Sequence, residues 1–337
     1  MRDRTYARAA AAAFALMATG TTLGLSLRPT PAATAQTVGP DSTPRVSGLG
    51  TTTPTDVSMR NVDFHVADGV VLRIRRLVGT MHGDSGIVHF DDPKSYVLDA
   101  KAAEVGMKGD ALTALLNDYV FAYPGAPLSH LHVEVEPDGL RQTGTLHKGV
   151  QIPFDMTSSV SLTQDGRIQL TAKRVKIFGV DGLVLMRALG LSLERMMDLS
   201  GAHGITVKGN DLFLDPLAIL PPPAIHGKLS SVRIEAGQLM QTLGDPRDTT
   251  LPPQTLDPAA KNYMLYRHGT LHFTKLYMPD AELLVVDADQ SSPFDFDNPN
   301  YVRQLIAGHS RTLPSLGLEV WMPDAYSLGK EVASQKR

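Results

Sequence analysis

The chain has 337 residues, of which 42% are apolar and 20% are charged, and its formal net charge is −3. This composition is typical of a globular protein. The acidic balance argues against nucleic acid as a partner, because proteins that bind nucleic acid present basic surfaces to the phosphates. The chain contains no cysteine, which excludes disulfides, cysteine nucleophiles and thiolate metal sites.

Residues 1–35 have the pattern of a secretory signal peptide. Arg2, Arg4 and Arg8 precede an apolar run that ends at a small-residue cleavage motif, with Ala35 as its last residue. Removal of this segment takes away four Arg and one Asp and changes the formal net charge from −3 to −6. An uncleaved membrane anchor is the alternative, although the run is only marginally apolar for a span of about 20 helical residues. We therefore predict a periplasmic or secreted protein.

Residues 36–56 are rich in Thr, Ser, Pro and Gly and lack periodicity, so a flexible tether is predicted there. A sheet-and-helix domain is predicted over 57–243, and it opens with alternating segments that are typical of β-strands. One of these segments carries Arg73, Arg75 and Arg76. The three guanidinium groups suit lipid headgroups at the mouth of a groove; a solvated strand edge is the alternative.

A short amphipathic helix is predicted after Asp110, a residue that suits the N-cap position. Its apolar residues follow the i, i+3, i+4, i+7, i+8 spacing of one helix face. These residues are Leu112, Leu115, Leu116, Tyr119 and Val120. An apolar stripe of this kind is expected to face a core.

Residues 128–178 are predicted to form a meander of four long antiparallel strands. Pro-Asp-Gly, Lys-Gly and Gln-Asp-Gly turn signals separate the strands. In the third strand, Ile152, Phe154 and Met156 alternate with polar residues. The meander is therefore expected to have one dry face and one wet face.

Residues 182–199 are apolar enough for a buried helix of about five turns. Gly190 weakens this helix by about 1 kcal/mol relative to Ala, or permits a bend. A broad apolar face would be formed by Leu185, Leu189, Leu193, Met196 and Met197. This face has to be buried against another element.

The remainder of the chain is expected to attach to the same domain. A Pro-rich loop is predicted over 244–261. It leads into a C-terminal extension over 262–324 that packs on the domain, followed by a tail over 325–337. The extension is expected to contain strands, a short helix near 301–307 and a last strand with the sequence GLEVWMP.

Four segments of the chain, GTLHKGVQIPF, DGRIQLTAKRVKI, GLVLMRALGLSL and GKLSSVRIEAGQLM, combine long strands with one very apolar helix. In this order they resemble the exported bacterial members of the tubular lipid-binding (TULIP-like) superfamily. The resemblance extends over about residues 133–241, about a third of the chain, and rests on pattern without an invariant motif. It implies a curved antiparallel sheet around a long helix, with a groove for acyl chains. It brings no catalytic residues and leaves the segment after residue 260 unplaced.

The predicted fold class is α+β and mostly β. It consists of a long curved antiparallel sheet wrapped around one or two apolar helices, with a smaller C-terminal strand-helix-strand extension. Leu and Met side chains suit acyl chains because they adapt to variable shapes. The candidate lipid-binding residues are Leu115, Leu116, Val120, Ile152, Phe154, Met156, Leu185, Leu189, Leu193, Met196 and Met197. The alternative for each of them is a place in an ordinary core.

Two groups of residues have the composition of metal sites. His130 and His132 form an H-x-H pair, and His147 lies across the predicted hairpin. Four carboxylates on one later segment suit calcium. They are Asp287, Asp289, Asp295 and Asp297. The wet face of a strand explains the histidines, and a solvated loop explains the carboxylates. No metal or other cofactor is therefore predicted, while calcium remains an open alternative.

The sequence contains no recognisable catalytic motif. It lacks the G-x-S-x-G nucleophile elbow and the glycine-rich loops of nucleotide-binding proteins. We therefore predict a protein that is not an enzyme; a His–Asp cluster in a cleft would favour an enzyme instead.

The leading functional hypothesis is a periplasmic protein that binds lipids or other amphiphiles in an apolar groove, with shuttling as an extension of that role. Its partners would be the lipid or amphiphile and, transiently, a membrane surface. No nucleic acid is expected, and the oligomeric state is left open. The alternative is a non-catalytic structural or interaction protein of the cell envelope whose own side chains fill the core.

Overall fold

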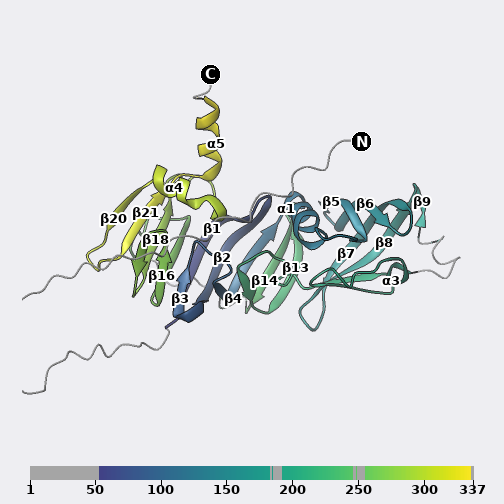
Figure 1. Ribbon diagram of the computed structural model, residues 1–337, viewed down its shortest axis with the longest axis horizontal. Helices are drawn as coiled ribbons and strands as arrows, with labels where there is room; N and C mark the ends of the chain where they lie inside the picture. Colours follow the sequence, from purple (N-terminus) through teal and green to yellow (C-terminus); the bar gives the residue numbers. More distant parts are fainter. Residues whose placement is uncertain (1–52, 183, 185–191, 246–247, 249–254, 335–337) are drawn as a thin grey trace, which may run out of the picture. The chain divides into compact units, whose positions relative to one another are not determined.

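The computed structural model is mostly β, with a large curved antiparallel sheet and few helices, which confirms the predicted fold class (Figure 1). It describes residues 53–182, 184, 192–245, 248 and 255–334. The predicted signal peptide, most of the predicted tether, and the candidates Leu185 and Leu189 lie outside the described residues.

The largest sheet contains eleven strands of the described chain. Its strands are β1 (Thr55–Ala67), β2 (Val70–Gly83), β4 (Tyr96–Met107), β12 (Ala224–His226), β13 (Leu229–Glu235), β14 (Gln238–Gly244), β15 (Tyr263–Arg267), β18 (Glu282–Asp287), β19 (Phe294–Asp297), β20 (His309–Thr312) and β21 (Leu318–Met322). Nine of them follow the order β13-β14-β4-β2-β1-β15-β18-β21-β20. The strands after the Pro-rich segment therefore continue the sheet that the first strands begin.

Strand β1 begins at Thr55, inside the segment predicted as a tether, and it has two partners on one edge. Its first half pairs with β15, ending at Arg60 opposite Tyr263, and its second half pairs in parallel with β19. Asn61 separates the halves with a φ of 50°, a backbone conformation that Asn adopts more readily than most residues. This break lets one strand receive two segments that are distant in sequence.

The predicted meander forms the core of a second sheet, with seven strands in the order β10-β11-β8-β7-β6-β5 and β9 against β8. The strands are β5 (Leu128–Glu136), β6 (Gly139–His147), β7 (Gln151–Leu162), β8 (Ile168–Ile177), β9 (Val180–Asp181), β10 (Ile205–Lys208) and β11 (Asp211–Leu214). The register of β5 to β8 is antiparallel throughout. The prediction of four meandering strands is confirmed, and we call this sheet the meander sheet.

Helix α1 (Gly109–Leu115) and the π-helical turn Leu116–Val120 cover the free edge of β5. The Asn117 side chain donates to the Leu131 carbonyl at 2.7 Å and accepts from the Leu131 N–H at 2.9 Å. The Thr113 hydroxyl accepts from the Val133 N–H at 2.9 Å. The two side chains thus occupy hydrogen-bonding positions that a neighbouring strand would take, which protects an otherwise open sheet edge.

The predicted apolar face of this helix is correct in part. Leu112, Leu115 and Val120 are buried, whereas Tyr119 is 39% exposed. The cause is the wide turn that starts at Leu116, because a π-turn adds a residue and shifts the positions that face the core.

A third, three-stranded sheet has its strand β3 next to β2 and β4 of the large sheet. It contains β3 (Ile87–His89), β16 (Thr270–Phe273) and β17 (Leu276–Met278). Aromatic rings fill the space beside it, with Phe90 in ring contact with Tyr96, Tyr266, Phe273, Phe296 and Tyr301. Two short 3-10 turns, Asp84–Gly86 and Asn298–Asn300, complete this region.

The predictions for two helices and for the C-terminal tail have different outcomes. The helix predicted near 301–307 is confirmed as α4 (Tyr301–Ala307). The continuous helix predicted over 182–199 is wrong over 192–199, because Ser192 and Met197 are both extended and only the single turn α3 (Leu193–Met196) between them is helical. The segment predicted as a tail, 325–337, contains helix α5 (Ala325–Ser334). Among the described residues, none of the helices is both long and apolar enough to span a membrane.

Candidate functional site

A cavity of about 100 Å³ lies between the meander sheet and the large sheet. It forms where the dry face of β5 to β8 meets α1, the ends of β4 and β14, and β10 and β11. The large sheet contributes Met107 and Leu239, the helix and its following turn contribute Leu115 and Leu116, and the meander contributes Phe154 and Met156. The alternation of the strands places these residues on one face.

Gln142 and Gln241 are the two polar side chains that line this cavity. The Gln142 amide donates to the Ser158 hydroxyl at 3.2 Å, so its polar atoms are engaged within the sheet. The Gln241 side chain is only 7% exposed, and it has no hydrogen-bond partner among the described residues. Gln241 therefore presents free hydrogen-bonding capacity to an otherwise apolar cavity.

A second cavity, of about 50 Å³, adjoins the first and is lined by apolar side chains alone. Leu128, Phe154, Met156 and Leu212 line both cavities. These four side chains are consequently the wall between them, and a rotamer change in Phe154 or Met156 would join the two spaces. The unbranched Met156 side chain changes shape at low cost.

The described members of the predicted lipid-binding set gather at these cavities. Leu115 and Leu116 line the first, Ile152, Leu193, Met196 and Met197 line the second, and Phe154 and Met156 line both. Val120 is buried but lines neither cavity. No local pattern singled out Gln241, Leu128 or Leu212, because their place at the cavities depends on strand pairing between distant segments.

The first cavity carries an energetic cost. Empty apolar space destabilises a fold by roughly 24 cal/mol per Å³, so a cavity of this size costs about 2 kcal/mol. Apolar cavities stay dry, and an engineered cavity of about 150 Å³ binds benzene or xenon. The space between the sheets is therefore suited to an apolar guest and not to water.

The three arginines predicted near a groove mouth lie on β2, in the interior of the large sheet, and each has an acidic partner. Arg73 pairs with Asp63 at 2.9 Å. Arg75 and Arg76 both pair with Glu104, at 3.2 and 3.0 Å. The strand edge predicted for them is therefore wrong, because β2 is paired on both sides, while their role as a headgroup site stays a prediction. The position of the three arginines on an interior strand follows from the pairing of β2 with both β1 and β4, which the local sequence pattern does not indicate.

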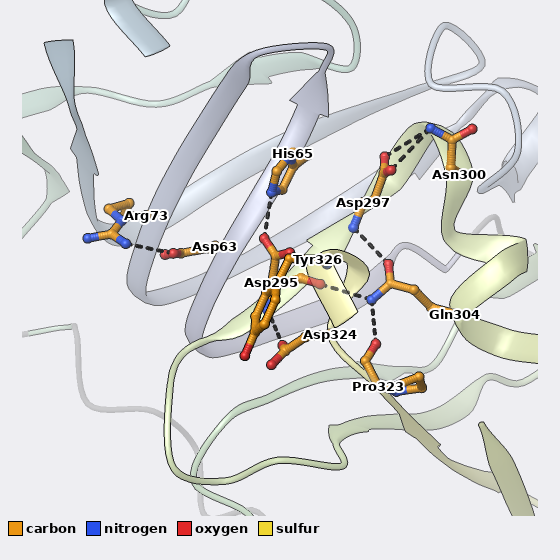
Figure 2. A network of polar contacts seen from close by, with 10 residues as sticks. All are labelled: Asp63, His65, Arg73, Asp295, Asp297, Asn300, Gln304, Pro323, Asp324 and Tyr326. Carbon is orange, nitrogen blue, oxygen red and sulfur yellow. Dashed lines mark hydrogen bonds and ion pairs between the residues drawn. The ribbon is translucent and has the colours of Figure 1, made fainter. Parts of the chain in front are cut away.

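A separate polar network joins the second half of β1 to β19 and to the C-terminal helices (Figure 2). His65 Nε2 lies 2.6 Å from Asp295 Oδ1, beside a cleft of about 340 Å³ that Arg73 and Asp63 also line. The other oxygen of Asp295 accepts the Tyr326 N–H at 2.9 Å. Asp324 in turn accepts the Asp295 N–H at 2.7 Å.

Hydrogen bonding and burial shift the acid–base properties of this network. The hydrogen bond to Asp295 raises the pKa of His65. Burial is the largest single influence on Asp295 and opposes its ionisation, but the hydrogen bond to His65, the charge of His65 and the bond from the Tyr326 N–H together outweigh burial and lower the pKa of that carboxyl. Burial raises the pKa of Asp324 and, one strand away, that of Asp287 to about 7.

This pair is a His–Asp cluster in a cleft, the feature that would favour an enzyme. Among the described residues lining the cleft there is no Ser, Thr, Cys or Tyr to act as a nucleophile. The buried Gln304 amide donates to the Asp295 and Pro323 carbonyls at 2.9 and 2.8 Å (Figure 2). The network thus connects β19 with α4 and with the start of α5.

The candidate metal ligands do not converge. Within the described part of the chain, no group of three or more His, Asp or Glu side chains is placed to hold a metal ion. Asp287 accepts from Asn262 and from the Asp289 N–H, while Asp297 accepts from Asn300. Of the histidines, His130 and His147 both contact the Ser129 hydroxyl, and His132 lies 3.7 Å from Glu134.

No family model, no curated protein and no solved structure matches the chain. The resemblance to the TULIP-like superfamily therefore stays a prediction, and the functional argument rests on the geometry of this chain.

Proposed function

We propose that the protein binds an apolar or amphiphilic molecule, such as a fatty acid or a lipid acyl chain, between the meander sheet and the large sheet. The observation that carries the proposal is the pair of adjoining apolar cavities with four shared side chains. Each methylene transferred from water into this space contributes about 0.8 kcal/mol. The free amide of Gln241 offers a hydrogen bond to a polar head.

The guest has to enlarge the space that it occupies. Pockets for small molecules usually span about 300 to 1,000 Å³, and the two cavities measure about 100 and 50 Å³. Met156, Met196 and Met197 are the side chains best able to move aside, because Met has three rotatable bonds and no branch. We therefore expect binding to be accompanied by rearrangement of the shared wall.

A titration of the full chain with a fluorescent fatty acid tests the proposal. Leu212→Phe places a ring in the shared wall and is expected to weaken binding about tenfold or more, a loss of about 1.4 kcal/mol. Leu98→Phe is the matched control, because Leu98 is buried to the same degree but lines a different cavity of about 40 Å³. Absence of uptake by the unsubstituted chain, or equal uptake by Leu212→Phe, would contradict the proposal.

The small size of the cavities supports a second candidate, a structural or interaction protein of the cell envelope. In that case the two cavities are packing defects, and no guest is needed. Native mass spectrometry of the full chain after gentle extraction separates the two candidates. A co-purifying lipid supports binding; a guest-free mass together with no fatty acid uptake supports the structural role.

A further inference from the structure

One end of the meander sheet exposes apolar side chains that folding does not explain. The residues are Val150 at 65%, Phe178 at 65%, Val180 at 63% and Val184 at 60% exposure. Val150 lies in the β6–β7 connection, Phe178 lies in the β8–β9 connection, and Val180 and Val184 lie in and after β9; the antiparallel order places these segments at the same end of the sheet. The Phe178 N–H donates to the Pro153 carbonyl at 3.3 Å, and β9 marks this end in Figure 1. We call this surface the meander tip.

The backbone conformation at position 178 of the tip is unfavourable for phenylalanine. Phe178 has a φ of 50° and Gly179 a φ of 78°, the signs of a two-residue turn that prefers Asn-Gly. The same signs occur at Ala236–Gly237. A bulky aromatic residue at positive φ is strained. Phe178 thus gains little from folding, either through burial or through its backbone.

Exposed basic side chains lie at the tip and along the strand that leads to it. Lys148 and Lys176 are exposed at the strand ends, and Lys173 and Arg174 are exposed further along β8, where Arg174 lies opposite Thr157. Of the described carboxylates close to them, Asp155 is held by Arg141 in two hydrogen bonds. Asp181 accepts the Val184 N–H, and Asp198 lies near Lys148. Lys176 lies opposite both Asp155 and Asp181 in the strand register, so the four exposed basic side chains exceed the three nearby carboxylates by a small margin, on a chain whose formal net charge is −3.

We propose that the meander tip docks on the surface of a bilayer that contains anionic phospholipids. Exposed Phe and Val side chains would enter the acyl boundary while Lys and Arg meet the phosphates, as in other interfacial segments. Val180 pairs with Ile177, and Ile177 lines the second cavity. This inference deepens the proposed function and rests on it in one respect: docking would bring the cavity wall to the membrane from which a guest enters.

Co-sedimentation of the full chain with vesicles tests the docking. One set of vesicles contains phosphatidylglycerol and phosphatidylcholine in equal parts, and the other contains phosphatidylcholine alone. Phe178→Asn suits the turn and removes the ring, so it is expected to raise Tm and to weaken partition into the mixed vesicles about tenfold. Lys176→Gln is expected to weaken it about fivefold, with little effect on the neutral vesicles.

Leu316→Asn is the matched control. Leu316 is 87% exposed and also has a positive φ, of 69°, but it lies in the β20–β21 turn of the large sheet. Unchanged vesicle binding by this variant together with a loss by Phe178→Asn supports the proposal.

Two results would overturn the docking. One is equal vesicle binding by Phe178→Asn and the unsubstituted chain, or no binding by either. The other is a change of oligomeric state in Phe178→Asn without a change in vesicle binding, which would assign the tip to a second copy of the chain. Fatty acid uptake in vesicle-free solution is measured on the same variants. Its retention after a negative vesicle result leaves the proposed function standing, whereas its absence would contradict that function separately.

Discussion

The two interiors of this protein are filled in different ways. The core beside β15, β18 and β19 contains Tyr266, Phe294 and Phe296, each fully buried, and the adjacent cavity measures only about 40 Å³. The space under the meander sheet is lined mostly by Leu, Ile and Met, with Phe121 and Phe154 among them, and keeps cavities of about 100 and 50 Å³. Aromatic rings pack closely in the core beside β15, β18 and β19, whereas flexible aliphatic side chains leave empty volume under the meander sheet.

Under the proposed function, the aromatic core stabilises the fold and the space under the meander sheet binds the guest. Phe273 and Tyr301 have ring centroids 4.6 Å apart, a contact that aromatic pairs favour beyond their burial. The hydrogen bonds from the Gln304 amide to the Asp295 and Pro323 carbonyls join β19 and α4 in the same region. The meander interior lacks such ring contacts among its described residues, so its packing is easier to change without loss of the fold.

The largest expected effect comes from opening the filled core. Phe296→Ala removes a ring that is fully buried and contacts several others, so it should lower the free energy of unfolding by about 3–5 kcal/mol. Urea denaturation measures this change. Fatty acid affinity of the folded protein should be unchanged; a loss below about 1 kcal/mol would show that this core is not filled as described.

The same substitution in the two interiors sharpens the comparison. Leu283 is fully buried beside the rings, and Leu283→Phe should cost about 1–3 kcal/mol through overpacking. Leu212→Phe has cavity space beside it and should cost less than about 1 kcal/mol. Equal losses in thermal or urea unfolding would remove the distinction between the interiors.

The pH dependence of stability should come from the C-terminal region. Asp287 has a pKa of about 7 in the folded protein, above its ordinary value. Because the folded state then binds a proton that the unfolded state has released, stability is present at acid pH and falls as pH rises toward 7. The fall between about pH 5.5 and 7 should be about 1.5 kcal/mol.

The pKa shifts of His65 and Asp295 make stability depend on pH in opposite directions. His65, with a raised pKa, contributes stability below its ordinary pKa and loses it as pH rises through the folded value. Asp295, with a lowered pKa, contributes above its ordinary pKa and loses this as pH falls. Asp287→Asn should flatten the slope between pH 5.5 and 7 in urea titrations. An unchanged slope would assign the dependence to another group.

The smallest effect is expected from a substitution of Gln241, which lines the first cavity. Gln241→Leu removes a side chain without a described partner, so stability should change by less than about 1 kcal/mol. Affinity for a fatty acid should fall a few-fold, whereas affinity for a plain hydrocarbon should not. Gln142→Leu is the control, because it breaks the bond to Ser158 and should cost about 1 kcal/mol without affecting head selectivity.

Local patterns predicted much of the fold. The alternation in 128–178 and its turn residues are short-range signals, and β5 to β8 follow them. The helix at 301–307 was visible for the same reason. The π-turn at Leu116 was not, because Tyr119 satisfies a regular helical spacing in the sequence.

Long-range features escaped prediction. His65 and Asp295 are separated by 230 positions, and their contact requires β1 to change partners at Asn61. The alternation of Asp63 and His65 with buried residues did indicate a polar face, but not what lies opposite it. The candidate liners were selected by composition, and no sequence pattern reports whether the space between them is filled.

Methyl resonances of methionine provide the most direct test of guest binding between the sheets. The full chain, labelled with ¹³C-methyl methionine, would be titrated with dodecanoic acid in solution. Met107, Met156, Met196 and Met197 line the cavities, whereas Met264 and Met322 are fully buried elsewhere. We predict saturable shifts of the cavity methyls and unchanged positions for Met264 and Met322. No shift at any cavity methionine, or shifts confined to Met264 and Met322, would contradict the proposed binding site.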